Sequence, residues 1–234
     1  FYVMSVEDID SIEQKEFDIA FINSATQYMG PADEFKSCIV KMIDKVRKGG
    51  KIFLGDNKSA VLQEKFYRLI ALWNGVCDDA EEKIDIKRKT DFEFYIGKEF
   101  FDSLSDIPRV KHITLLVKKG KAVTEMNMFR YEAVIYLDEY DEKEYFDIDC
   151  SDTDISAIEE KLRENSNKEC IRLANIRNKL LNDVFSEKLG EEKLVSLYVS
   201  DVCELAEKYG YNVTAVPSEN ESPEYFNIEA YRTV

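Results

Sequence analysis

The chain has 234 residues, enough for one large domain or two small ones. Hydrophobic residues make up 44% and aromatic residues 12% of it, which is ample for a packed core and argues against a disordered chain. The formal net charge of −15 repels phosphate backbones and anionic lipid, so we expect neither nucleic acid nor a membrane as a partner.

The sequence carries no sign of secretion, of a membrane span or of a metal site. Its longest apolar runs, such as Ile19 to Ile22, are too short to cross a bilayer, and no basic segment followed by an apolar stretch opens the chain. The 5 cysteines are scattered, and no C-x-x-C pair occurs. We therefore expect reduced, mostly buried thiols in a cytoplasmic protein without a metal. The start at Phe1 rather than Met suggests a piece of something longer.

The first half of the chain alternates strands and helices. Residues 17–23 form an apolar run that is typical of a strand covered on both faces. Helical spacing of apolar residues predicts a helix from Pro31 to Lys48, which Gly49-Gly50 ends. A second buried strand follows at 51–55 and a second helix at 59–73. This order indicates an α/β fold with parallel strands.

The second half mixes helices and strands. Residues 78–110 are expected to form a small helical insert or lid, and the basic triplet within them, Lys87 to Lys89, a solvated loop. Residues 140–154 are crowded with acidic side chains, which indicates a solvated loop at a subdomain boundary. The other predicted elements are strands at 112–117 and 131–137, a helix at 155–163, a strand at 170–174, helices at 178–189 and 201–209, and strands at 211–216 and 225–231.

Polar side chains follow the first two predicted strands where each strand ends. Asn23 and Ser24 come after the first strand, and Asp56 comes after the second. Ligands of open parallel sheets bind beyond the carboxyl ends of the strands, so these tips point to a small-molecule site. Turns and helix caps use the same residue types, so the alternative of ordinary turns stays open.

Five segments of the chain carry recognisable motifs. Three read FDIAFINSATQYM at residues 17–29, KVRKGGKIFLGDNKS at 45–59 and KKGKAVTEMNMFRYEAVIYL at 118–137; two later ones are ECIRLANIRNKLLNDV at 169–184 and SDVCELAEKYGYNV at 200–213. In this order they resemble blocks of the N-methyltransferase domains embedded in nonribosomal peptide synthetases. The resemblance covers nearly the whole chain. GGKIFLGD is common to many methyltransferases, whereas N-S-x-x-Q-Y combined with F-R-Y-[DE] is much more specific.

The resemblance implies a Rossmann-like methyltransferase sheet whose N-terminal strands are missing, followed by an α+β subdomain. We therefore predict a methyltransferase core at residues 1–139, with the helical insert at about 78–110, and a C-terminal subdomain at 140–234. The family also implies S-adenosyl-L-methionine as cofactor and an aminoacyl group on a carrier domain as substrate. Adjacent adenylation and carrier domains are the implied partners.

The family's site residues carry over by position. Glu7 and Asp8 match the turn that meets the adenine ring, although a solvent-facing acidic loop is an equal alternative. Asn23 and Ser24 match the family's positions beside the methionine moiety and the methyl group. The residues matched to the acceptor side or to polar positions of later blocks are Gln27, Tyr28, Asp56, Glu125, Arg130 and Tyr131.

In methyl transfer to an amine the protein mainly aligns the amine with the methyl group and excludes water from both, because the sulfonium donor is already activated. Oxygen atoms of Asn23, Asp56 or Glu125 are expected to orient N–H groups, and the two carboxylates to accept the released proton. Arg130 and Tyr131 have the alternative of an ordinary strand start with the arginine in a salt bridge. The lone His112 falls outside the matched polar positions and is expected to be structural.

The chain departs from the family pattern in one major respect. No G-x-G-x-G loop occurs in these residues, and without it no backbone approaches the ribose and carboxylate of the donor closely. We therefore expect this chain alone to be inactive. Smaller departures at Met29-Gly30, Asn57, Thr124 and Glu132 leave substrate preference open.

Two rival functions remain at this point. One is a non-catalytic, methyltransferase-like scaffold between synthetase domains, which the absent glycine loop favours. The other is a stand-alone methyltransferase for a diffusible amine or hydroxyl, which differs only in its context.

Overall fold

The chain folds into two compact units that alternate along the sequence. The computed structural model describes residues 4–74, 80–218 and 223–233, without the side chains of Glu7 and Ala80. The first unit comprises residues 1–60, 92–115 and 131–142, and the second comprises 61–91, 116–130 and 143–234. The predicted boundary at residue 140 falls close to the last crossing between the units. The division into domains 1–139 and 140–234 itself stays a prediction.

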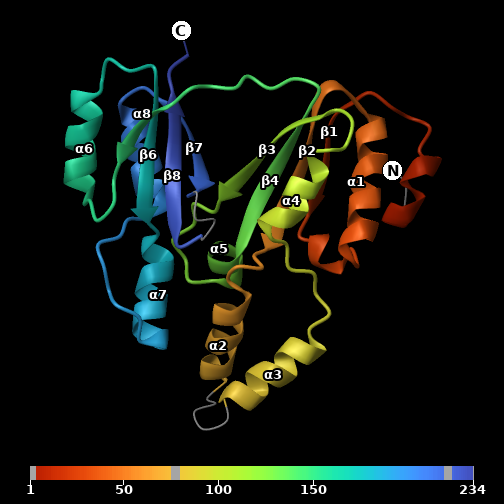
Figure 1. The fold of residues 1–234 in the computed structure, drawn as a ribbon, viewed down its shortest axis with the longest axis horizontal. Helices are drawn as coiled ribbons and strands as arrows, with labels where there is room; N and C mark the ends of the chain where they lie inside the picture. The colour runs from red at the N-terminus through yellow and green to blue at the C-terminus, as the bar shows by residue number, and fades with distance from the viewer. Residues whose placement is uncertain (1–3, 75–79, 219–222, 234) are drawn as a thin grey trace. The chain divides into compact units, whose positions relative to one another are not determined.

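The first unit is built on a four-stranded sheet with the order β1-β2-β4-β3. Its strands are β1 (Phe17–Asn23), β2 (Val46–Lys58), β4 (Arg130–Leu137) and β3 (Val110–Val117). β1 and β2 are parallel, and α1 (Ala32–Lys45) links them and runs alongside both (Figure 1). The predicted α/β class and the parallel pair are therefore confirmed.

One face of this sheet is covered by helices. α1 and α4 (Lys98–Leu104) pack on it, with Phe35 stacked on Phe100 at 5.1 Å between ring centroids. Ile52 and Leu54 of β2 meet this helical layer and are fully buried. Burying side chains of this size contributes roughly 1.5–3 kcal/mol each, so this helical layer stabilises β2 in its place in the sheet.

The opposite face of β1 is open, and the prediction that this strand is covered on both faces is wrong. Phe17, Ile19 and Phe21 are exposed, the last by 71%. β1 lies at the edge of the sheet and pairs only with β2, so one long edge of its backbone has no neighbouring strand within the sheet. Ala20 and Ile22 alone face the helical layer.

The link between α1 and β2 has no loop. α1 ends at Lys45, not at Lys48, because Val46 already has extended backbone angles (φ −92°, ψ 137°). β2 therefore starts at Val46 and extends well beyond the predicted 51–55. The extra length needs the left-handed backbone of Gly49 (φ +69°) and a register shift opposite Phe17 and Ile19.

The second predicted helix begins later than expected. Ser59 forms an isolated parallel bridge with Ile96, and the Ala60 N–H donates to the Ile96 carbonyl at 3.2 Å. These contacts keep residues 59 and 60 out of the helix, so α2 spans Gln63–Trp73. Trp73, its last residue, is half exposed.

The second unit has its own mixed sheet, with the order β5-β6-β8-β7. The strands are β5 (Phe146–Asp149), β6 (Cys170–Arg177), β8 (Tyr225–Tyr231) and β7 (Asn212–Pro217). β5 and β6 are parallel and are linked by α6 (Ile155–Glu164), whereas β8 runs antiparallel to β6 and β7. α6 and α8 (Val199–Lys208) lie beside this sheet (Figure 1), and their apolar side chains pack in its core.

Two predicted loops contain regular structure. β5 lies within the acidic stretch 140–154, because Ile148 and Cys150 alternate into the core while Asp147 and Asp149 face outward. The basic triplet at 87–89 forms the last turn of α3 (Ala80–Thr90). The structure also adds η1 (Val6–Ser11), η2 (Thr26–Tyr28) and α5 (Glu125–Phe129), whereas α7 (Lys179–Leu189) confirms the helix predicted at 178–189.

The thiols behave as expected wherever the structure describes them. Cys38, Cys150 and Cys203 are buried, and burial raises the pKa of the Cys150 thiol to about 11. Cys77 lies outside the described residues. Across the described parts of the chain, no helix is both long enough and apolar enough to cross a membrane.

Candidate functional site

The two parallel strands of the first unit end side by side. In the β1–β2 register Asn23 is the partner of Gly55, and the Ser24 N–H donates to the Gly55 carbonyl at 3.1 Å. The Ser24 hydroxyl then donates to the Asp56 carboxylate. Asn23, Ser24 and Asp56 thus lie together at the carboxyl edge of the sheet, where α/β proteins bind their ligands.

Gly55 is needed for this approach. A Cβ at that position would overlap the Asn23 side-chain oxygen. Only glycine allows the exposed amide of Asn23 to lie across the neighbouring strand. Gly55 therefore leaves room for the Asn23 side chain, and the next residue, Asp56, accepts a hydrogen bond from Ser24.

The backbone at this edge is strained. Ser24 has φ +55° and Asp56 has φ +59°, and both lie in the left-handed region that side chains other than glycine seldom adopt. Such residues persist where the surroundings hold them, and they concentrate at functional sites. Ser24 and Asp56 are in contact, but so are the left-handed residues Arg109 and Asp138 elsewhere in this unit, so the strain alone does not single this edge out.

Behind the tips lie buried polar side chains with free oxygens. Thr26, Gln27 and Asn57 are all at least 96% buried. The Gln27 amide donates to the Ser24 carbonyl at 3.1 Å, and the Asn57 amide donates to the Leu54 carbonyl at 2.8 Å. Their side-chain oxygens, and the Thr26 hydroxyl, have no hydrogen-bond partner among the described residues.

A cavity of 520 Å³ lies between η1 and α1, and on the side of the β1 tip its lining begins at Tyr28. Its volume is within the range of small-molecule sites. Tyr28 borders it and is 73% exposed. The cavity lining comprises Ser5, Val6, Tyr28, Met29, Gly30, Glu34, Ser37, Cys38 and Lys41.

The predicted adenine turn belongs to η1, beside this cavity. Val6 lines the cavity, while Asp8 is exposed and its N–H donates to the Ser5 carbonyl at 3.1 Å. The side chain of Glu7 lies outside the described residues. The roles of Glu7 and Asp8 stay predictions.

Tyr131 is a core residue by its surroundings. Its ring packs edge-on to Phe101 at 6.1 Å, and its hydroxyl donates to the Ile96 carbonyl at 2.9 Å. Burial, together with the charge of Glu99, raises the pKa of the Tyr131 hydroxyl above its usual value. The hydroxyl therefore stays protonated at neutral pH and donates.

Glu125 and Arg130 belong to the second unit and contact each other. The Arg130 guanidinium donates to the Glu125 carboxylate at 2.7 Å from Nη2 and at 3.1 Å from Nε. This is the salt bridge that the sequence left as an alternative. Their predicted roles toward the substrate stay predictions.

The segment from Phe92 to Gly97 was not expected at the site. The Phe94 N–H donates to the Gln27 carbonyl at 2.9 Å, and the Ile96 N–H donates to the Lys58 carbonyl at 2.8 Å. Lys58 is itself buried and forms an ion pair with Glu93. The sequence signal was the alternation of apolar residues within 92–96, which indicates an extended segment rather than part of a helical insert.

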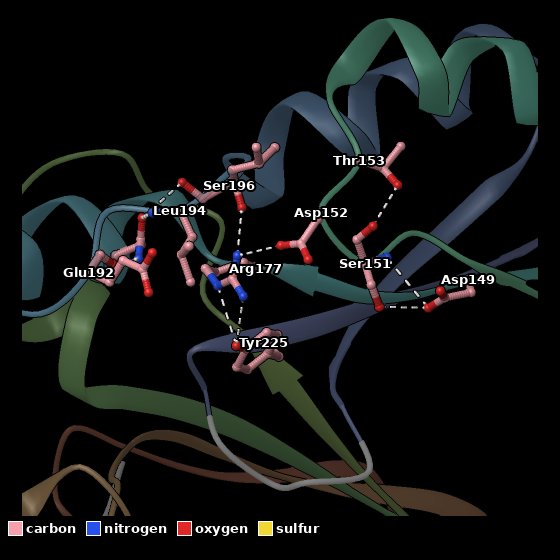
Figure 2. A network of polar contacts seen from close by, with 11 residues as sticks. Asp149, Ser151, Asp152, Thr153, Arg177, Glu192, Leu194, Ser196 and Tyr225 are labelled. Carbon is pink, nitrogen blue, oxygen red and sulfur yellow. Dashed lines mark hydrogen bonds and ion pairs between the residues drawn. The ribbon is translucent and has the colours of Figure 1, made fainter.

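The second unit has a comparable polar edge, at the ends of β5 and β6. Arg177 is its centre: its guanidinium donates to the Asp152 carboxylate at 2.9 Å, to the Tyr225 hydroxyl at 3.0 Å and to the Val195 carbonyl at 3.0 Å (Figure 2). Asp149 accepts from the Ser151 hydroxyl at 2.8 Å. Over the described ranges, no three His, Cys, Asp or Glu side chains gather as metal ligands would.

Comparisons with known proteins agree on one class. Cyclosporin synthetase of Tolypocladium inflatum is 31% identical over 144 residues, which is 58% of this chain and 1% of that protein. Enniatin synthase of Fusarium equiseti is 26% identical over 191 residues, and bassianolide nonribosomal cyclodepsipeptide synthetase of Beauveria bassiana is 24% identical over 190. Each of these two matches covers 75% of this chain and 6% of the relative.

The relatives are nonribosomal peptide synthetases. They are enzymes of many domains, and this chain spans only between 1% and 6% of the length of those three. No family model matches the chain. A role connected with nonribosomal peptide synthesis is supported by these relatives.

Proposed function

We propose that this chain is the later part of an S-adenosylmethionine-dependent N-methyltransferase domain of a nonribosomal peptide synthetase. Its substrate is the amine of an aminoacyl group tethered to a carrier domain, and its neighbours are adenylation and carrier domains. Support comes from the ordered motifs of the sequence, from the class of its relatives and from the geometry of the β1–β2 edge.

The observation that carries the proposal is the meeting of Asn23, Ser24 and Asp56 at the carboxyl edge of the parallel pair. Tyr28, four residues after Ser24, lines a cavity large enough for a nucleoside. A polar edge of a parallel pair, strained at two residues and near a cavity, is the arrangement expected of a ligand site. Ordinary turns satisfy their polar groups locally, which does not account for the free buried oxygens of Thr26, Gln27 and Asn57.

The residues present fit one half of the cofactor. Val6 and Met29 offer apolar surface for an adenine ring, and Ser5 and Glu34 offer polar groups within the same cavity. The glycine-rich loop that would approach the ribose and carboxylate is not in this sequence. We therefore expect binding of the whole donor only where another segment supplies that loop.

The chemistry at the edge follows from its side chains. When bound, S-adenosylmethionine would supply a methyl group on a positively charged sulfur. The exposed amide oxygen of Asn23 would accept a hydrogen bond from the amine and so direct its lone pair. Asp56, held by the Ser24 hydroxyl, would take the proton that the amine loses. Gln27 would support the tip through its bond to the Ser24 carbonyl.

Calorimetry tests the proposal. S-adenosylhomocysteine is titrated into the natural polypeptide that contains these residues, and the titration is repeated with Asn23→Ala. Binding by the first and a loss of about tenfold in affinity by the second are expected, because Asn23 also matches the family's position beside the methionine moiety of the donor and one well-placed polar contact contributes about 1–1.5 kcal/mol. A folded polypeptide that binds no donor at millimolar concentration would contradict the proposal.

A second candidate is a non-catalytic scaffold between synthetase domains. The specific observation in its favour is the open apolar face of β1, because Phe17, Ile19 and Phe21 offer a contact surface that catalysis does not use. The same titration separates the two functions: a scaffold keeps its fold and binds no donor, with or without Asn23→Ala.

A further inference from the structure

The segment Phe92–Gly97 crosses the carboxyl edge of the sheet. Its hydrogen bonds to the carbonyls of Gln27 and Lys58 attach it to the ends of both β1 and β2. It is therefore a wall of the proposed site, built from a part of the chain that lies more than 60 residues from the β1 tip.

The wall is held rigidly by its alternate side chains. Phe94 packs edge-on to Phe35 at 6.2 Å and to Phe100 at 5.8 Å, and Ile96 is 1% exposed. Glu93 pairs with the buried Lys58. A segment anchored through Glu93, Phe94 and Ile96 does not open freely, so we interpret it as a fixed part of the site rather than as a lid.

Phe92, at the start of this wall, is 94% exposed. Tyr28, on the other side of the Gln27–Phe94 hydrogen bond, is 73% exposed. Single exposed apolar residues are common on protein surfaces, but here two aromatic rings flank one hydrogen bond at a ligand-binding edge. Neither ring has an aromatic partner among the described contacts, so both are available to a ligand.

The position of Tyr28 separates two sides of the edge. On one side lies the 520 Å³ cavity, which Tyr28 lines. On the other lies the wall, attached through Gln27. If the cavity takes the donor, the face between Tyr28 and Phe92 is where the acceptor enters.

We propose that Phe92 and Tyr28 form the acceptor side of this site and select an aminoacyl group with an apolar side chain. The inference rests on the proposed function. The rings would pack against the apolar side chain, while the carboxylates of Asp56 and Glu93 at the same edge favour the amine end. Phe92 is thus a specificity-determining residue.

Acceptor specificity tests this inference. The natural polypeptide, with S-adenosylmethionine, is assayed on the N-acetylcysteamine thioesters of phenylalanine, valine and glycine. With Phe92→Ser we expect KM for the phenylalanine and valine thioesters to rise about tenfold, because an apolar contact distinguishes substrates by about that factor. KM for the glycine thioester should change less than about twofold, since glycine has no side chain to contact the ring.

The matched control is Phe21→Ser, which removes another exposed phenylalanine of the same unit, from the open face of β1. It should leave all three KM values unchanged. Affinity for S-adenosylhomocysteine should be the same in both variants and the parent. Equal KM changes on all three thioesters, or none on any, would overturn the role of Phe92.

The test also separates this inference from the proposed function. If the parent binds no donor and transfers no methyl group, the proposed function fails. Binding of phenylalanine amide and of glycine amide to the parent is then measured by NMR, and the two affinities test whether Phe92 contacts an apolar side chain. A preference for phenylalanine amide that Phe92→Ser abolishes supports an acceptor rim, and equal binding of the two amides overturns it.

Discussion

The two sheets of this chain end in similar ways but treat their polar groups differently. In both units two parallel strands are joined by a helix, and polar residues follow each strand. Both edges also contain left-handed residues: Ser24 (φ +55°) and Asp56 (φ +59°) in the first unit, Asp152 (φ +51°) and Asn175 (φ +63°) in the second.

At the edge of the second unit most polar groups satisfy one another, although the buried Ser218 hydroxyl, beside Tyr225, has no partner among the described residues. Arg177 donates to a carboxylate, a hydroxyl and a carbonyl, and Asp149 accepts from Ser151 (Figure 2). Asp149 also accepts from Asn175. At the edge of the first unit, three buried oxygens have no partner within the described chain. A saturated network stabilises a fold, whereas an unsaturated one leaves groups for a ligand.

The largest expected effect comes from breaking the saturated edge. Arg177→Met removes a largely buried guanidinium and leaves the Tyr225 hydroxyl and the Val195 carbonyl without a donor. We expect the free energy of unfolding to fall by about 3 kcal/mol, measured by urea denaturation. Arg163→Met is the control, because its pair with Glu159 is at 3.7 Å and exposed, and it should change stability by less than about 0.5 kcal/mol. Similar losses in both variants would contradict a structural role for the network.

A smaller loss is expected at the unsaturated edge. Gly55→Ala places a Cβ against the Asn23 side chain and the Phe53 ring, so one of them must move. We expect a loss of about 1–2 kcal/mol together with a shifted Asn23 side-chain amide signal in NMR spectra. Gly97→Ala serves as the control, since the added methyl meets only the flexible end of Glu99. An unshifted Asn23 signal in Gly55→Ala would show that the glycine does not position this residue.

The smallest effect concerns pH. Hydrogen bonds from Asn175 and Ser151 hold the pKa of the Asp149 carboxyl below its usual value. A lowered pKa adds stability that is present above the unfolded value of about 3.9 and is lost as the pH falls through the folded value. Asn175→Gly keeps the left-handed backbone but removes one hydrogen-bond donor to Asp149. The pKa of Asp149 should therefore rise, and the protein should lose less stability as the pH falls. Carboxyl NMR titration measures the pKa, and an unchanged value would rule out Asn175 as its main cause.

The sequence predicts two strands to the residue, 17–23 at the edge of its sheet and 225–231 between β6 and β7, so the position of a strand within its sheet does not decide how well it is predicted. β5 was missed because acidic residues alternate with the buried Ile148 and Cys150. The high acidic content of residues 140–154 predicted a solvated loop, and this prediction ignored the alternation. The late start of α2 depends on Ile96, which is distant in sequence and therefore invisible to local patterns.

The site was predictable in part for the same reason. Asn23 ends β1, Ser24 follows it, and Asp56 lies within β2 next to Gly55, so their meeting depends on parallel pairing, which the strand–helix–strand order indicates. The continuation of β2 past Asp56 to Lys58 was not predicted. The wall at 92–97 depends on tertiary hydrogen bonds to Gln27 and Lys58 and was assigned to a helical insert. The separation of Glu125 and Arg130 into the other unit also depends on packing, and no spacing in the sequence encodes it.

The bare outer strand of the first sheet has a practical consequence. A seven-residue edge with three outward aromatic or aliphatic side chains is a template on which further chains can add as strands. The strong negative charge slows such addition at low ionic strength, and salt screens that repulsion. The purified chain should therefore aggregate as the salt concentration is raised, under conditions in which the chain is still folded.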